Sequence, residues 1–194
     1  MPADLEPAAR RMEILVTGIS DDQLGLPTPC PSYRVGDLLD HICTFTVKFA
    51  EAARKDLDQL QDAPGPGDAA RLPADWRERI PRNLTVLVES WRDPAAWDGM
   101  TRIGGGDTPG EVAGMVGLEE LVVHGWDLAR ASGQDEACDQ ASLEGALTTL
   151  AMFQKPGEEH EPGSAFGTVV EVSGDADLLD RVVALSGRDP SWTP

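Results

Sequence analysis

Hydrophobic side chains recur every three or four positions along much of this 194-residue chain, which is the spacing of one helix face. Residues 5–19 show this spacing first and are predicted to form a helix. Residues 35–61 and 76–91 repeat it and predict two more helices. Pro81 lies inside the third stretch, so we expect it to kink that helix or divide it.

The start of a fourth helix has the clearest local signal. Thr108 can cap the helix, Pro109 fits its first position, and Glu111 stands three residues after the cap. The helix is expected to continue to about residue 131, because Gly133 follows where a left-handed C-terminal cap would end it.

Two further helices are predicted in the last third of the chain, over residues 142–153 and 178–185. Between them, residues 168–172 are rich in β-branched side chains, but the sequence has no second strand-rich region with which they could pair. Residues 20–34 and 93–107 are rich in proline or glycine and are expected to form irregular loops. Without repeats or alternating strands and helices, the pattern predicts an all-α helical bundle.

The composition narrows the function classes. The chain has 34 acidic and 16 basic residues, a net charge of −18 and no Lys/Arg cluster, so nucleic acid and anionic membranes are not expected partners. No apolar run approaches the roughly 20 residues that span a bilayer, and the N-terminal residues do not resemble a signal peptide. We therefore expect a cytoplasmic protein in which Cys30, Cys43 and Cys138 are reduced thiols.

The chain has three histidines, and two of them lie on predicted helices. His41 follows Leu38 by three residues and precedes Phe45 by four, which places it on the apolar face of its helix. Its neighbour Asp40 should face outward. An isolated inward-facing histidine is more often a hydrogen-bonded core residue than a metal ligand. Taken alone, His41 therefore favours a structural role.

The fourth helix changes this interpretation of His41. Glu120 and His124 stand one turn apart on one face, and both should point toward the core because Leu121 and Leu128 lie beside them. A buried carboxylate and imidazole need a compensating charge, and a divalent metal completed by His41 would provide it. The alternative is a solvent-exposed Glu–His pair, which the apolar neighbours disfavour.

Two imidazoles and one carboxylate would leave a coordination position open for water or substrate, as in catalytic metal sites. Zinc is the default metal for these ligands, although nickel, iron and manganese also accept them. The sequence lacks a His-Glu-x-x-His motif, so metalloprotease chemistry is not expected.

Asp127 lies one turn after His124 and has two interpretations that the sequence supports equally. It can hold the ligand imidazole by a hydrogen bond from outside the coordination sphere, or it can pair with nearby Arg130. Arg188 is expected to form a surface salt bridge with Asp189, with reach into the metal pocket as the less favoured option.

The remaining candidates favour roles outside the site. Cys30 lies between two prolines and is expected to pack in a loop, because no nearby cation or helix start would activate its thiol. Cys43 projects about 200° around its helix from His41, so it should not join the same site. His160 lies in an acidic segment and is expected to be exposed and without a functional role.

Four motifs, spread over nearly the whole chain, resemble one known family. In chain order they are Thr28-Pro29-Cys30-Pro31, residues 35–41 ending in Leu38-Leu39-Asp40-His41, Glu120-Leu121-Val122-Val123-His124-Gly125-Trp126-Asp127-Leu128-Ala129-Arg130 and Gly187-Arg188-Asp189-Pro190-Ser191-Trp192. The sequence is similar to actinobacterial proteins related to mycothiol-dependent maleylpyruvate isomerase, within the DinB-like superfamily. The segment with Glu120 and His124, together with the upstream His41, is the most specific of the four.

The resemblance implies a DinB-like four-helix bundle with an additional helix and a loop-rich C-terminal tail. It also implies a metal held by His41, Glu120 and His124, the residues that the helical spacing selects. The open position would receive the thiol of mycothiol or a similar low-molecular-weight thiol, and coordination would make that thiol a nucleophile at neutral pH. We expect one domain over residues 1–194, with a C-terminal extension from about residue 155.

Three functions are compatible with such a site. The leading hypothesis is a thiol-dependent transferase or isomerase that acts on a small electrophile, so its partners would be a small-molecule substrate and the thiol. The alternatives are a hydrolase that uses metal-activated water and a stress-response protein that binds a metal or ligand without turnover. Bundles of this size often pair through an apolar helix face, and the sequence leaves monomer and homodimer both open.

Overall fold

The spacing of apolar residues predicts most of the helices that the structure contains. The computed structural model describes residues 2–60, 65–155 and 167–194. Its helices are α1 (Glu6–Thr17), α2 (Val35–Arg54), α3 (Trp76–Trp91), α4 (Pro94–Trp97), α5 (Gly110–Ser132), α6 (Gln140–Phe153) and α7 (Leu178–Leu185). Three short 3-10 turns are η1 (Asp21–Gln23), η2 (Leu57–Gln59) and η3 (Ala69–Arg71).

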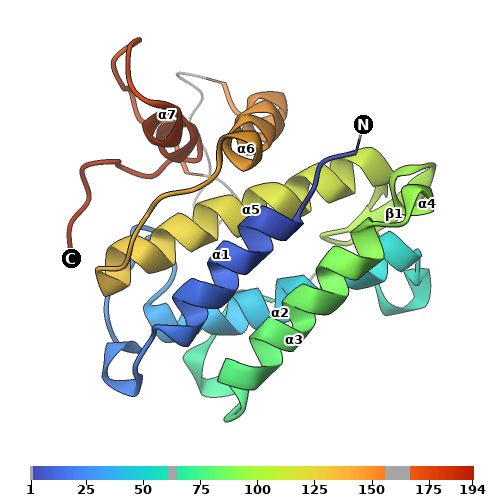
Figure 1. Cartoon of the computed structure of the whole chain (residues 1–194), viewed down its shortest axis with the longest axis horizontal. Helices are drawn as coiled ribbons and strands as arrows, with labels where there is room; N and C mark the ends of the chain where they lie inside the picture. Colours follow the sequence, from blue (N-terminus) through green and yellow to red (C-terminus); the bar gives the residue numbers. More distant parts are fainter. Residues whose placement is uncertain (1, 61–64, 156–166) are drawn as a thin grey trace.

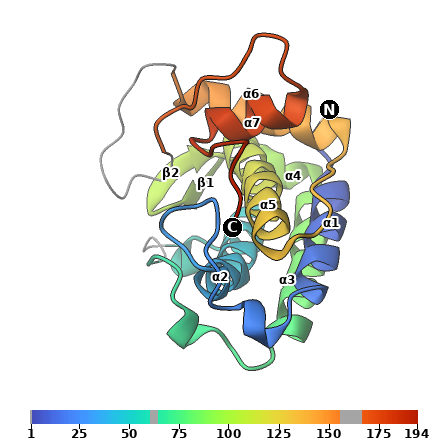
Figure 2. The same ribbon diagram turned by 90° about the vertical axis from the view of Figure 1, so that its left-hand side faces the viewer.

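Four helices, α1, α2, α3 and α5, form a bundle that Figure 2 shows nearly end-on. Each contacts two neighbours, in the order α1, α3, α2, α5 and back to α1. α6 packs on α5 and α7 packs on α6, so the C-terminal part lies as a layer along one side of the bundle (Figure 1). This arrangement confirms the predicted all-α bundle. It also encloses α5, which has buried residues on most of its circumference.

The second helix is shorter than its apolar spacing predicts. α2 ends at Arg54 rather than near residue 61, because Lys55 has a left-handed backbone with φ of 57°. Leu60 keeps the apolar spacing and is buried, but it follows η2 instead of a helical turn. Residues 61–64 lie outside the described part of the chain.

Pro81 lies inside α3, which continues through it, so of the two predicted effects, a kink or a division of the helix, division does not occur. A proline removes one backbone hydrogen bond of a helix. Ile80 and Leu84 lie on either side of Pro81 and are almost completely buried, which stabilises the helix across this position.

A short β-hairpin precedes α5, where the sequence predicts only turns. β1 (Met100–Ile103) pairs with β2 (Gly106–Pro109) in antiparallel register. The turn between them is made by Gly104 and Gly105, whose φ values of 57° and 79° lie in the left-handed region that favours glycine. Strands of four residues are too short to show a clear period of two.

The hairpin also changes the start of α5. Thr108 lies in β2 and its hydroxyl donates to the carbonyl of Gly106, so it does not cap the helix as predicted. The helix begins at Gly110, one residue after Pro109. Its predicted end is confirmed, because Gly133 has φ of 70° and forms the left-handed cap.

The tail after α6 contains no strand within its described residues, although residues 168–172 are rich in β-branched side chains. The N–H of Val170 donates to the carbonyl of Ala184 at 2.9 Å, which ties this segment to α7. No helix in the described ranges is long and apolar enough to cross a membrane.

Candidate metal centre

His41 projects from α2 toward Glu120 and His124, which lie one turn apart on α5. Oε2 of Glu120 is 3.3 Å from Nε2 of His41 and 3.1 Å from Nε2 of His124. The three donor atoms all lie within 4.8 Å of one another. The side chains are 18%, 24% and 9% exposed for His41, Glu120 and His124, so the cluster is mostly buried but open to small molecules. The structure thus brings together the three residues that the helical spacing selects.

The second nitrogen of His124 is held by Asp127. Nδ1 of His124 is 2.9 Å from Oδ2 of Asp127, whose side chain is completely buried. A histidine that donates from Nδ1 to a carboxylate has its Nε2 lone pair free for a metal. Arg130 bonds instead to Glu136 and to the carbonyl of Trp192. Of the two interpretations of Asp127, the contact with the imidazole is therefore the one present.

Arg188 is buried and joins the contact between His124 and Asp127 to form a hydrogen-bonded network of three residues. The predicted surface salt bridge between Arg188 and Asp189 is therefore wrong. Nη2 of Arg188 lies 3.2 Å from Oδ2 of Asp127, and only 6% of the residue is exposed. The backbone after α7 turns back toward α5 because Gly187 adopts φ of 82°, which places Arg188 inward. Asp189 instead accepts hydrogen bonds from the backbone and hydroxyl of Ser191.

The charges in this network shift the protonation of their neighbours. Burial opposes the charged form of His124, but its hydrogen bonds to Asp127 and Glu120 outweigh burial and raise its pKa to about 10. Burial also opposes ionisation of Glu120, yet hydrogen bonds from His124 and His41 hold its pKa well below the usual carboxyl range. An imidazolium between two carboxylates therefore stabilises the metal-free site.

Glu119 is a further buried acidic residue close enough to Glu120 and His124 to interact with their charges, and the helical spacing does not predict it. It is only 3% exposed, and burial together with the neighbouring charge of Glu120 raises its pKa to about 8. Glu119 and Glu120 are neighbours in sequence and lie on different faces of α5, so a helix with one buried face would expose one of the two side chains. Both side chains are mostly buried here, because other helices cover α5 on several sides.

Aromatic rings surround the imidazoles. Tyr33 stacks on His41 with ring centroids 5.3 Å apart and an interplanar angle of 30°, and Phe45 lies 5.5 Å from the same ring. The Tyr33 hydroxyl accepts a hydrogen bond from the backbone N–H of Gly67 at 3.3 Å, and burial raises the pKa of that hydroxyl. Tyr33 belongs to the proline-rich loop before α2, so no helical spacing could have assigned it to the site.

A pocket of about 260 Å³ opens beside His41 and Glu120. Its walls are mostly apolar and come from α2, α5, the β-hairpin and the residue after η2. The lining residues are His41, Phe45, Lys48, Phe49, Leu60, Arg102, Ile103, Gly104, Val116 and Glu120. A small molecule in this pocket would lie next to two of the three candidate ligands.

Other polar candidates lie apart from the metal-ligand cluster. Asp40 is buried rather than outward-facing, because it accepts hydrogen bonds from the N–H of Asp68 and from Arg71. Cys43 is buried near Asn83, and burial raises the pKa of its thiol, as expected for a residue that does not join the site. Cys30 is buried as predicted. His160 lies outside the described residues.

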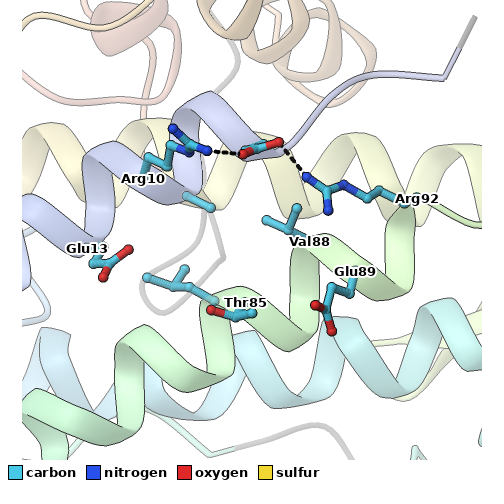
Figure 3. A pocket seen from close by; sticks show the side chains of 9 residues that line it. Arg10, Glu13, Thr85, Val88, Glu89 and Arg92 are labelled. Carbon is cyan, nitrogen blue, oxygen red and sulfur yellow. Dashed lines mark hydrogen bonds and ion pairs between the residues drawn. The ribbon is translucent and has the colours of Figure 1, made fainter.

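A second hollow, of about 210 Å³, lies between α1 and α3 and shares no residue with the first (Figure 3). Arg10 and Arg92 reach toward it, but both pair with Glu6, which lowers the pKa of that carboxyl. No histidine or cysteine lines this hollow. Its two arginines are taken up by surface ion pairs with Glu6, so the hollow offers no arrangement suited to catalysis.

The donor set of the cluster fits a divalent metal. Two imidazole nitrogens and one carboxylate oxygen are donors that zinc accepts in sites with an open position. When His124 is neutral, as metal ligation requires, the charges of Glu120 and Asp127 exceed that of the buried Arg188 by one, and a divalent ion would offset this excess. The contact between Asp127 and His124 matches the usual support of a ligand histidine.

Comparison with known proteins bears on the same residues. A family model described as "Mycothiol maleylpyruvate isomerase N-terminal domain" matches residues 5–129, which include the three donors and Asp127 but not Arg188. Over 176 residues the chain is 24% identical to uncharacterized proteins of Mycobacterium tuberculosis strains CDC 1551 / Oshkosh and ATCC 25618 / H37Rv, covering 90% of this chain and 90% of each relative.

The fold is similar to two solved structures. They are crystal structures of the mycothiol-dependent maleylpyruvate isomerase and of a histidine-to-alanine mutant of it, with a TM-score of 0.57 for both and identities of 12% and 11%. The match covers 75% of this chain and 66% of the solved chain. The chain thus spans just under two thirds of the length of those structures, and a likeness at this identity concerns the fold alone.

Proposed function

Because the chain belongs to the mycothiol maleylpyruvate isomerase N-terminal domain family, we propose that it binds a divalent metal and uses mycothiol or a similar low-molecular-weight thiol. The proposed metal ligands are His41, Glu120 and His124. The proposed reaction is transfer of the thiol to a small electrophile, or thiol-assisted isomerisation of one. Convergence of the three donor atoms beside an open pocket is the observation that carries this proposal.

Zinc is the first metal to test, and nickel, iron and manganese accept the same donors. A divalent metal bound here would stabilise the thiolate form of a coordinated thiol, which makes the sulfur nucleophilic near neutral pH.

The remaining residues of the site position its donors. Asp127 accepts a hydrogen bond from Nδ1 of His124 and thereby presents Nε2 toward Glu120. Arg188 holds Asp127 in its ionised form, because the guanidinium lowers the pKa of that buried carboxyl. Tyr33 and Phe45 pack against the ring of His41 and hold its orientation.

We also propose that residues 1–194 act as a single domain with a C-terminal extension from about residue 155. Arg188 supports this, because it comes from the extension and completes a contact with Asp127 on α5. Its burial makes the extension part of the support for the site rather than an independent tail.

Metal content measured on the purified protein tests the proposal. We expect about one divalent ion per chain, lost in Glu120→Gln and retained in Glu144→Gln. Glu144 is a matched control because it is an exposed glutamate on α6 whose side chain accepts a hydrogen bond from Gln140 and lies outside the candidate metal site. Equal metal content in the two variants would refute the assignment of Glu120 as a ligand.

A thiol titration separates the proposed reaction from its alternatives. If the metal binds but a low-molecular-weight thiol does not bind to it, the thiol-dependent function is wrong. A hydrolase or a protein that binds without turnover would then be the function to test at the same metal site.

A further inference from the structure

We propose that the pocket beside His41 and Glu120 binds a small molecule with an apolar body, of about the size of one aromatic ring, and a single carboxylate that interacts with Lys48 and Arg102. That this molecule is the electrophile of the reaction rests on the proposed function. The binding of the molecule to the pocket is independent of that function, because neither the apolar walls nor the two cations are metal ligands.

The walls of the pocket determine the apolar part of the ligand. Phe45 and Phe49 stand edge-to-face with ring centroids 6.2 Å apart, and Ile103 and Val116 add aliphatic surface from β1 and α5. An apolar cavity of roughly 150 Å³ is enough to hold benzene. The 260 Å³ here therefore accommodates a ring and a short acidic chain.

Two cations line the same pocket in a chain whose net charge is −18. Lys48 contacts Glu51 at 3.1 Å and the carbonyl of Gln59 at 2.6 Å, which leaves one of its three N–H groups for a ligand. Arg102 uses Nε and Nη2 to bond Asp107, so its Nη1 remains available. The Asp107 side chain is 69% exposed, so its pairing with Arg102 is weakened by water.

The arrangement along α2 separates the two ends of the ligand. Lys48 is seven residues after His41, which is two helical turns and about 10 Å along the axis. The phenylalanines lie between or beside them. A ligand whose carboxylate reaches Lys48 therefore places its apolar body toward the metal-ligand cluster. A second carboxylate midway along the ligand would lie against apolar walls without a partner, which favours a ligand with a single carboxylate.

Isothermal titration calorimetry with phenylpropionate tests this inference, because that molecule combines a ring with one carboxylate and is not an electrophile. We expect it to bind at least tenfold more tightly than phenylpropanol, which lacks the charge, and than succinate, which lacks the ring. Arg102→Gln and Lys48→Gln should each weaken binding about fivefold to tenfold. Arg79→Gln should leave it unchanged, because Arg79 pairs with Asp75 on the surface of α3 and lies outside the pocket.

The titration is done on the protein with and without metal, so that a failure of this inference can be distinguished from a failure of the proposed function. Binding that requires metal and ignores Lys48 and Arg102 would mean that the carboxylate ligates the metal, which overturns the inference. Equal affinities for the three probes would also overturn it. If phenylpropionate binds as expected but a thiol does not bind the metal, the inference holds and the proposed function fails.

Discussion

Replacing Arg188 with methionine should destabilise the folded protein by about 3 kcal/mol or more, since removing one partner of a buried ion pair typically costs about 3–5 kcal/mol. The change leaves Asp127, whose side chain is completely buried, without the guanidinium 3.2 Å away. The imidazole of His124 at 2.9 Å remains as a partner, which places the cost in the metal-free protein at the lower end of this range. Metal binding requires neutral His124, so the cost should be larger in the metal-loaded protein.

Urea denaturation followed by circular dichroism measures the difference in unfolding free energy between the original protein and Arg188→Met. In a thermal melt, a loss of about 3 kcal/mol in a chain of this length corresponds to a fall of about 6–12 °C in melting temperature. Arg181→Met is the matched control, because Arg181 is an exposed arginine on α7, and its cost should be within about 0.5 kcal/mol. The double variant Asp127→Leu with Arg188→Met should regain much of the lost stability, since it removes both buried charges. A cost below about 1 kcal/mol for Arg188→Met would refute the reasoning, because that is typical of a surface pair.

Three further predictions concern the metal and the pH. Asp127→Asn should weaken metal affinity about 10–100-fold, as measured by competition with a chromophoric chelator, and a change below twofold would contradict its role in holding His124. Chelation should lower the melting temperature yet leave helical circular dichroism at room temperature, because the ligands come from helices with a packed core; complete loss of that signal would argue against this. The melting temperature of the metal-free protein should fall from about pH 6.5 to 10, because the pKa of His124 rises from 6.5 to about 10 on folding and the stability from its protonated form is lost through that window. His124→Gln should flatten this fall, and an unchanged pH profile would show that another group causes it.

The helical period selects the three residues that the structure brings together, His41, Glu120 and His124. Glu120 and His124 share a face because they are four residues apart, and the apolar neighbours of His41 indicate its inward side. The side chains from α2 and α5 meet because these two helices are neighbours in the bundle. The spacing of apolar residues within each helix does not predict which helices are neighbours. The extent of the domain, residues 1–194, stays a prediction.

The residues whose roles the local sequence does not determine depend on contacts between distant parts of the chain. Arg188 is 61 residues from Asp127, and its local sequence of glycine, arginine, aspartate and proline is typical of an exposed turn. Tyr33 lies in an irregular loop, where no period indicates which side chain faces the core. Asp40 is predicted to face outward from α2, but Asp68 and Arg71 cover it. Such polar contacts follow from loop placement, which local pattern does not determine.

The central claim, that the cluster of His41, Glu120 and His124 presents a metal to a low-molecular-weight thiol, is tested most directly on cobalt-substituted protein. Thiolate ligation to cobalt gives an intense near-ultraviolet charge-transfer band. We predict that this band appears on titration with a low-molecular-weight thiol, that its midpoint falls as pH rises because binding releases a proton, and that His124→Ala abolishes it. A cobalt spectrum that stays unchanged at saturating thiol, while the metal remains bound, would contradict the account.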